Sequence, residues 1–218
     1  DYTFDSLSQR EETAMGLIMV WVNRILFLKL LESQLVRFNG GDTKFAFLNN
    51  IHDFNELHTL FFSVLAIPVD ERSHEIAERF RNVPYLNSSL FELSDVERNY
   101  FSVNSLNNGN IKLMQGTVVK DHRGRVATGT RPLLDYILLF LDSFDFGSGN
   151  ETEGKTIINA SVLGLIFEKI NGYRDGSFFT PGYITSYLCH NVIRETVLQK
   201  MNDTFHLHCK DFEDLKEN

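Results

Sequence analysis

The longest hydrophobic pattern in the chain lies near the amino terminus, from Glu11 to Phe38. This stretch lacks proline and is apolar on nearly every face before Asn23, as is typical of a long helix in a protein core. Asn23, Arg24 and Lys29 interrupt the apolar run, so we favour a central buried helix over the alternative of a membrane span. The glycines after Asn39 predict the end of this helix.

Shorter helical patterns follow along the chain, and a loop separates two of them. The loop is Val83 to Glu92. Pro84 and the lack of a helical period predict that its backbone is irregular, and its apolar residues predict that it packs against the rest of the protein. Ser73 is a candidate cap for the charged helix before this loop. The further helices are predicted over 50–66, from residue 70, from residue 131, over 159–170 and over 181–201, and the last residues, 210–218, are predicted to be a solvated tail.

The periodicity changes between Tyr100 and Thr130, where short β-like runs flank the turn Asp121 to Gly124. This pattern predicts a hairpin. The expected fold is therefore mainly α, a bundle-like helical domain with a small β-hairpin insertion at about residues 100–130. The expected division is a helical domain over 1–146, a Gly- and Ser-rich linker over 147–158, and a second helical part over 159–218.

Charge limits what the surface can bind. The net charge of −8 argues against a protein whose whole surface grips nucleic acid or an anionic membrane. The hairpin region is the exception, because five cations there face a single acid, Asp121. Of these cations, Lys120, Arg123 and Arg125 are candidate contacts to the DNA backbone, and an ordinary solvated loop is the alternative. The cations are Lys112, Lys120, Arg123, Arg125 and Arg131.

Residues that could carry catalysis or bind metal match no familiar pattern. His206, His208 and Cys209, with Cys189 and His190, offer zinc ligands, but their spacing fits none of the usual sites, so a small metal-dependent hydrolase is a minor alternative. The triplet Asp145 to Gly147 resembles a kinase motif without its companions, and Glu153 and Lys155 have nuclease spacing without a strand. We predict no catalytic residue and no metal site. The two cysteines favour a reducing, cytoplasmic setting.

Near the carboxyl terminus, Thr180 and Pro181 form a typical helix start. The free amides at such a start suit a carboxylate or a phosphate, and Phe178 and Phe179 could wall an apolar pocket beside it. A capped helix packed by aromatic residues is the plainer alternative.

The stretch Leu163 to Leu188 resembles the region ahead of the catalytic core in class I adenine-N6 DNA methyltransferases, especially the polypeptides that fuse restriction and modification activities. Trp21 to Glu32 and Val83 to Glu92 look like further stretches of that family, although Ser88 and Ser89 stand where glycines are usual. The resemblance implies that a Gly-x-Phe-Phe-Thr-Pro motif helps hold the methionine end of S-adenosylmethionine. In this chain the motif comprises Gly176, Phe178, Phe179, Thr180 and Pro181.

The glycine-rich cofactor loop and the Asn-Pro-Pro-Tyr segment of those enzymes do not occur in the 218 residues. The resemblance therefore implies a connector of a longer protein, lying between a nuclease and a methyltransferase domain and contacting DNA through that protein. Such a connector by itself is expected to be inactive and to bind no cofactor. The alternative is a self-contained helical protein-interaction module whose partner surface includes the apolar positions of Leu17 to Leu31.

Overall fold

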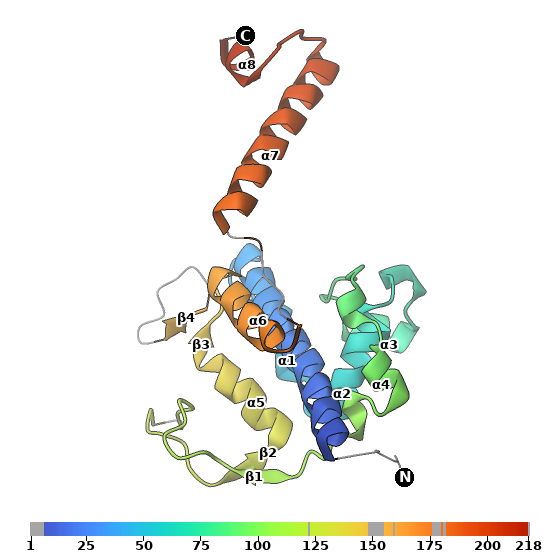
Figure 1. Ribbon diagram of the computed structural model, residues 1–218, viewed down its shortest axis with the longest axis vertical. Coiled ribbons are helices and arrows are strands. Elements are labelled where there is room, and N and C mark those ends of the chain that lie inside the picture. Colours follow the sequence, from blue (N-terminus) through green and yellow to red (C-terminus); the bar gives the residue numbers. More distant parts are fainter. Residues whose placement is uncertain are drawn as a thin grey trace. The chain divides into compact units, whose positions relative to one another are not determined.

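The computed structural model of the chain describes residues 7–121, 123–147, 155–158, 160–175, 180 and 182–217. The chain divides into two compact units, residues 1–170 and 171–218. The prediction of a mainly α fold with a small hairpin is confirmed (Figure 1). The division between the units falls inside helix α6, Ala160–Asp175, whereas the predicted linker over 147–158 lies mostly outside the described residues.

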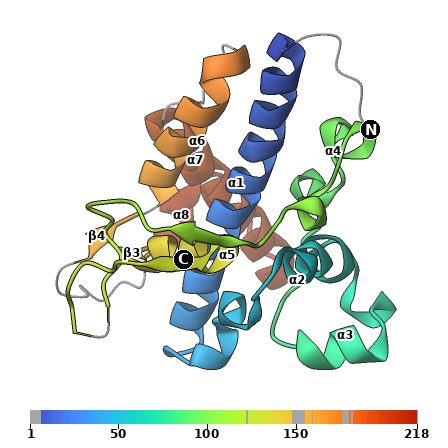
Figure 2. The same cartoon turned by 90° about the horizontal axis from the view of Figure 1, so that it is seen from below.

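Helix α1, Leu7–Phe38, is the centre of the first unit and confirms the predicted long amino-terminal helix. It runs between the group formed by α2, α3 and α4 and the segment that contains α5 (Figures 1 and 2). Leu17, Leu28 and Trp21 are buried in the core. By length and composition α1 could also cross a membrane, but its burial and the polar pairs described below match a core helix better. At its end Gly40 and Gly41 adopt positive φ angles, as the sequence predicted.

The segment after α1 is less regular than its sequence pattern suggested. Asp53 accepts hydrogen bonds from the amides of Asn55 and Glu56, so the helix begins at residue 54 instead of residue 50. Its second half widens into a π-helix whose side chains are largely buried. The elements here are η1 Thr43–Phe45, η2 Phe47–Asn50, α2 Phe54–Thr59, the π-helix η3 Leu60–Leu65 and η4 Val69–Glu71.

The region up to the hairpin consists of short helices joined by well-packed loops. Ser73 caps the charged helix as predicted, since its hydroxyl accepts from the amide of Ile76. The loop from Val83 to Glu92 is irregular apart from one turn of 3-10 helix, and Phe91 within it is fully buried. The elements are α3 His74–Arg79, η5 Ser89–Phe91, α4 Asp95–Asn99 and η6 Val103–Ser105.

The predicted hairpin insertion is built from an antiparallel pair and one further bridge. Strand β1, Asn110–Lys112, pairs with β2, Thr130–Pro132, and Lys120 bridges Val126 nearer the tip. Leu113, Val119, Ala127 and Tyr136 form a small core of their own beneath it. The chain then continues into α5, Leu133–Asp142, and a short parallel pair, β3 Phe144–Asp145 with β4 Thr156–Ile157.

Helix α6 adds Leu163, only 2% exposed, to the core of the first unit. The second unit contains α7, Gly182–Phe205, and α8, Phe212–Glu217, which contacts α7. None of the residues 210–216 in the predicted solvated tail is buried, but residues 212–217 form a helix that was not predicted. Asp211 begins this helix, because its carboxylate accepts from the amides of Glu213 and Asp214.

Candidate functional site

Two of the stretches that carry the family resemblance meet at Arg24. Arg24 lies on α1, is 1% exposed, and belongs to the stretch Trp21 to Glu32. Its Nε donates to the carbonyl of Leu90 and its Nη2 to the carbonyl of Glu92, each at 2.6 Å. Both carbonyls belong to the loop from Val83 to Glu92. One buried guanidinium thus joins segments that lie 66 or more positions apart in the sequence.

The same guanidinium forms a two-pronged ion pair with Glu97, at the start of α4. Nη1 and Nη2 lie 2.6 and 2.8 Å from the two carboxylate oxygens, and the indole of Trp21 donates to one of them at 2.9 Å. Ser94 completes the arrangement through a capping box with Glu97. Phe61 and Phe62 lie with their ring centroids 5.4 and 5.1 Å from the guanidinium carbon.

This network, called here the Arg24 network, consists of Trp21, Arg24, Ser94, Glu97 and the carbonyls of Leu90 and Glu92. Burial by itself would raise the pKa of the Glu97 carboxyl, but hydrogen bonds from Arg24, Ser94 and Trp21 hold that pKa below its ordinary value. The Glu97 carboxylate is thus paired with a cation, and both of its oxygens accept hydrogen bonds. The network is suited to holding three segments together and offers no reactive group to a substrate.

A second buried ion pair fixes α1 to the opposite side of the unit. Lys29 pairs with Glu32 at 2.6 Å and also with Asp142 at the end of α5. Glu32 in turn accepts from the amide of Leu48. Although burial lowers the pKa of Lys29, the adjacent carboxylates raise it above its ordinary value overall. Arg24 and Lys29, the charged residues that argued against a membrane span, therefore form ion pairs inside the protein.

The candidate DNA contacts Lys120, Arg123 and Arg125 lie together near the hairpin tip and are all exposed. The Asp121 carboxylate accepts from the amides of Arg123 and Arg125, at 2.8 and 2.9 Å, and thereby forms the turn. It also pairs with the Arg125 guanidinium at 3.1 Å. These contacts hold the pKa of Asp121 below its ordinary value. Arg131, another cation of the region, pairs with Asp135.

The cofactor motif lies almost wholly outside the described residues. Gly176, Phe178, Phe179 and Pro181 are not among them, and only Thr180 is described, as an exposed residue two positions before α7 begins. Its part in binding S-adenosylmethionine stays a prediction. The long helix predicted after the motif is present, and it extends to Phe205.

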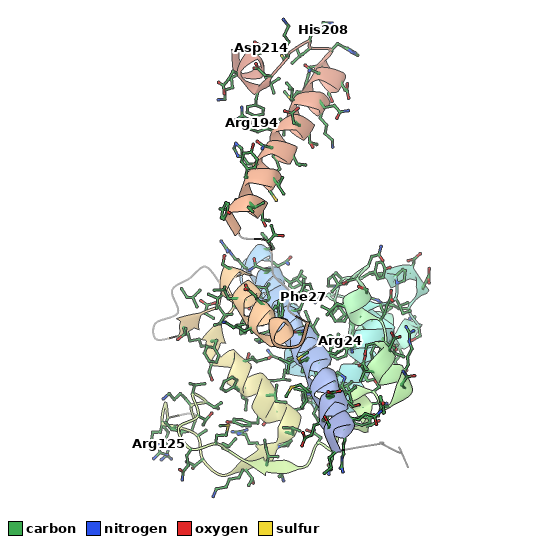
Figure 3. The ribbon with its side chains drawn as sticks, viewed as in Figure 1. Arg24, Phe27, Arg125, Arg194, His208 and Asp214 are labelled. Carbon is green, nitrogen blue, oxygen red and sulfur yellow. The ribbon has the colours of Figure 1, made fainter. Side chains whose placement is uncertain are left out.

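The cysteines and histidines of the second unit are spread along α7 and its end. Cys189 is exposed, whereas Cys209 is buried and is held by Asn202, whose side chain bonds both the amide and the carbonyl of Cys209. Thirteen helical residues between 189 and 202 correspond to about 20 Å. Within the described part of the chain, no group of three or more metal-ligating side chains gathers. Figure 3 labels His208, which precedes α8, and Asp214, which lies within it.

Asp145 and Gly147, which resembled a kinase motif, form a local turn. Asp145 is 7% exposed, its carboxylate accepts from the Gly147 amide at 3.0 Å, and its carbonyl accepts from the Ile158 amide. Gly147 has a φ of +103°. Lys155, from the nuclease-like pair, donates to the carbonyl of Asp142, and Glu153 lies outside the described residues.

An apolar groove of about 620 Å³ lies between α1 and α5 and was not predicted from the sequence. Trp21, Ile25 and Tyr136 line its interior, and Ile18, Met114 and Phe140 leave apolar surface exposed at its edges. A helical pattern alone does not reveal such a groove, because it depends on how neighbouring helices are spaced. By contrast, most of the predicted partner surface from Leu17 to Leu31 is part of the protein core.

Comparison with known proteins gives one family and one distant relative. Residues 1–161 match the model of a family described as "Domain of unknown function (DUF7814)". A protein of Methanocaldococcus jannaschii that is named as a type II restriction enzyme and methyltransferase is 28% identical over 199 residues, covering 84% of this chain. The match spans only 15% of that relative's length. No solved structure matches the chain.

Proposed function

The chain belongs to the family described as Domain of unknown function (DUF7814), and we propose that it is a non-catalytic helical region of a restriction-modification protein. In that role it couples a nuclease to an S-adenosylmethionine-dependent adenine-N6 DNA methyltransferase in the cytoplasm. The name of the M. jannaschii relative supports the link to restriction and modification. The small share of the relative that is matched agrees with a role as one region of a much longer protein.

The Arg24 network is the observation that carries the coupling role. Its ion pair and hydrogen bonds join α1, the loop before α4 and α4 itself, and all of them are internal. Buried, satisfied polar networks make a protein region rigid. A rigid region can hold two catalytic domains at a constant separation, and it needs no reactive residue of its own.

The cofactor and DNA contacts of this proposal lie in separate parts of the chain. Gly176, Phe178, Phe179, Thr180 and Pro181 would help hold the methionine end of S-adenosylmethionine, with the rest of the cofactor bound by the methyltransferase domain. Helix α7 follows the motif directly in the sequence, and the free amides at a helix start favour an anionic group, which supports this assignment. The exposed cations Lys120, Arg123 and Arg125 would contact DNA phosphates without reading the base sequence.

The proposal is tested by comparing this chain with the product of the complete gene. The complete product is expected to transfer labelled methyl groups from S-adenosylmethionine to adenine in DNA, whereas residues 1–218 are expected to show neither methyl transfer nor calorimetric binding of the cofactor. A complete product without methyltransferase activity would rule out the coupling role. A clear cofactor titration with the 218-residue chain would show that the binding site is contained within it.

The DNA contact is tested separately in the complete gene product by reversing three charges, Lys120→Glu, Arg123→Glu and Arg125→Glu. For every phosphate that the hairpin no longer neutralises, the slope of log affinity against log salt should fall by about 0.9 on duplex DNA. Arg10, Lys200 and Lys210 are exposed cations elsewhere, so their reversal is the matched control for total charge. Equal effects of the two triple variants would exclude a specific contact by the hairpin.

The apolar groove favours the alternative, a helical protein-interaction module, because exposed apolar edges at Ile18 and Phe140 suit an apolar partner surface. Sedimentation of the chain distinguishes the two functions. A dimer that Phe140→Asp converts to monomer would favour the interaction module, and a monomer at all concentrations would remove self-association from consideration.

A further inference from the structure

A second group of cations surrounds a pocket on the side of the first unit away from the hairpin. The pocket has a volume of about 390 Å³ and lies between η1, η2 and the end of α3. In Figure 1, α3 and the hairpin lie on opposite sides of α1. The lining residues are Lys44, Phe47, Asn50, Glu78, Arg79, Phe80, Arg81, Asn82 and Val83.

The base of the pocket is part of the core and is therefore rigid. Phe47, Phe80 and Val83 line it, and each is only 3% exposed. The Asn82 side chain donates to the carbonyl of Lys44 at 3.1 Å, which ties the two sides of the rim together. A pocket with such a base keeps its shape without a ligand and loses little entropy when it binds one.

The polar groups of the rim favour an anion. Lys44 and Arg81 are exposed and form no ion pair with any described residue. Arg79 uses one nitrogen, Nη2, to bond the Asn50 carbonyl at 3.1 Å and Glu56 at 2.5 Å. Its Nε and Nη1 form no hydrogen bond with the described residues and remain available.

Two of the three cations at the pocket have side chains without a carboxylate partner among the described residues. The lining cations are Lys44, Arg79 and Arg81, and the lining acid is Glu78. Of the acids beside the lining, Glu56 pairs with Arg79, and Asp42 accepts from the backbone amide of Lys44. The side chains of Lys44 and Arg81 form no ion pair with the described residues, and they line the same pocket as the amide groups of Asn50 and Asn82. Arg and Lys together with amide donors are the usual ligands of phosphate groups.

We infer that this pocket binds a phosphate group, supplied either by the backbone of a nucleic acid or by a free polyphosphate such as that of a nucleotide. Lys44 and Arg81 would provide the charge, and Arg79 would donate through Nε and Nη1. The site is independent of the cofactor motif and of the hairpin. Phosphate binding here would therefore stand even if the methyltransferase link failed, and the reverse also holds.

The test uses the 218-residue chain with two probes, inorganic triphosphate in calorimetry and a short DNA duplex in fluorescence anisotropy over a salt series. The double variant Lys44→Ala with Arg81→Ala should weaken binding of the relevant probe about tenfold or more. For the duplex, the salt slope should also fall by about 0.9 for each phosphate that is no longer bound. The control is Arg10→Ala with Lys200→Ala, which removes the same charge at exposed positions elsewhere.

The outcomes assign the source of the phosphate or reject the site. A selective loss of triphosphate binding identifies a free polyphosphate, and a selective loss of duplex binding identifies the nucleic acid backbone. Arg81→Lys, which keeps the charge but removes the fork of donors, should fall between the wild type and the double variant. If neither probe binds, or if the control pair weakens binding as much as the pocket pair, the inference is wrong. Unchanged denaturation midpoints show that the variants are folded.

Discussion

Arg24 and Arg125, both labelled in Figure 3, are paired with a carboxylate but serve opposite purposes. The Arg24 side chain is 1% exposed and bonds a carboxylate and two carbonyls, so none of its charge reaches solvent. The Arg125 side chain is 67% exposed and, among the described residues, pairs with Asp121 alone, four residues away. The buried arginine holds distant segments together, whereas the exposed one pairs with the aspartate of its own turn and stays in contact with solvent.

The difference follows from desolvation. A buried ion pair is stable only when hydrogen bonds satisfy both ions, and removal of one partner leaves the other as an uncompensated buried charge. An exposed pair is solvated before and after its loss, so it contributes little to stability. Cations of the first kind therefore hold the fold together, whereas cations of the second kind can be replaced with little loss of stability.

The largest expected effect is on the Arg24 network. Arg24→Met should lower the free energy of unfolding by about 3 to 5 kcal/mol, because Glu97 would remain buried without its cation. Urea denaturation of the 218-residue chain measures this change. The double variant Arg24→Met with Glu97→Leu should be more stable than Arg24→Met alone, since the unpaired charge is gone. Additive losses in the double variant would mean that the two side chains are not coupled.

A smaller effect is expected from pH. The folded pKa of Glu97 is below its unfolded value, so its ionised form contributes stability that is present above the unfolded pKa and is lost as pH falls through the folded pKa. The denaturation midpoint should therefore decrease once the pH is lowered below about 4.3, the ordinary pKa of a glutamate. Glu97→Gln should be less stable at neutral pH and show a shallower decline in acid. An identical decline in wild type and variant would assign the acid sensitivity to other carboxylates.

The smallest effect is expected from Arg125→Ala, which should change the free energy of unfolding by less than about 1 kcal/mol. The backbone amides of Arg123 and Arg125 still bond Asp121 in this variant, so the turn is retained. The same urea denaturation, run beside Arg24→Met, provides the direct contrast. A loss comparable with that of Arg24→Met would show that the hairpin cations are structural and would weaken their assignment to DNA.

Parts of this fold were predictable because their signals are local. The apolar run before Phe38 predicted α1, and the residues Asp121 to Gly124 predicted the hairpin turn. Ser73 capped α3 as its type and position indicated. Ser94 and Glu97 also have the spacing of a capping box, a signal that could have located the start of α4.

Other parts depended on residues far apart in the sequence. The partner of Glu97 is Arg24, 73 positions earlier, and a single sequence contains no sign of that pairing. The π-helical turn at Leu60–Leu65 and the apolar groove arise from packing between elements, which local propensity does not describe. The sequence analysis did not predict helix α8, because the helix has only six residues and most of them are charged, although Asp211 is a good cap.

The sequence by itself determined the helical class, the central helix, the position of the hairpin and the exposed cations at its tip, because periodicity, turn chemistry and charge are written in neighbouring residues. Only the tertiary structure decided which cations are buried and which are available. The apolar run around Arg24 and Lys29 indicated a buried helix, but it did not show which partners would neutralise their charges. Their roles depend on whether carboxylates and carbonyls from distant segments surround them and replace the water that each charge would otherwise keep.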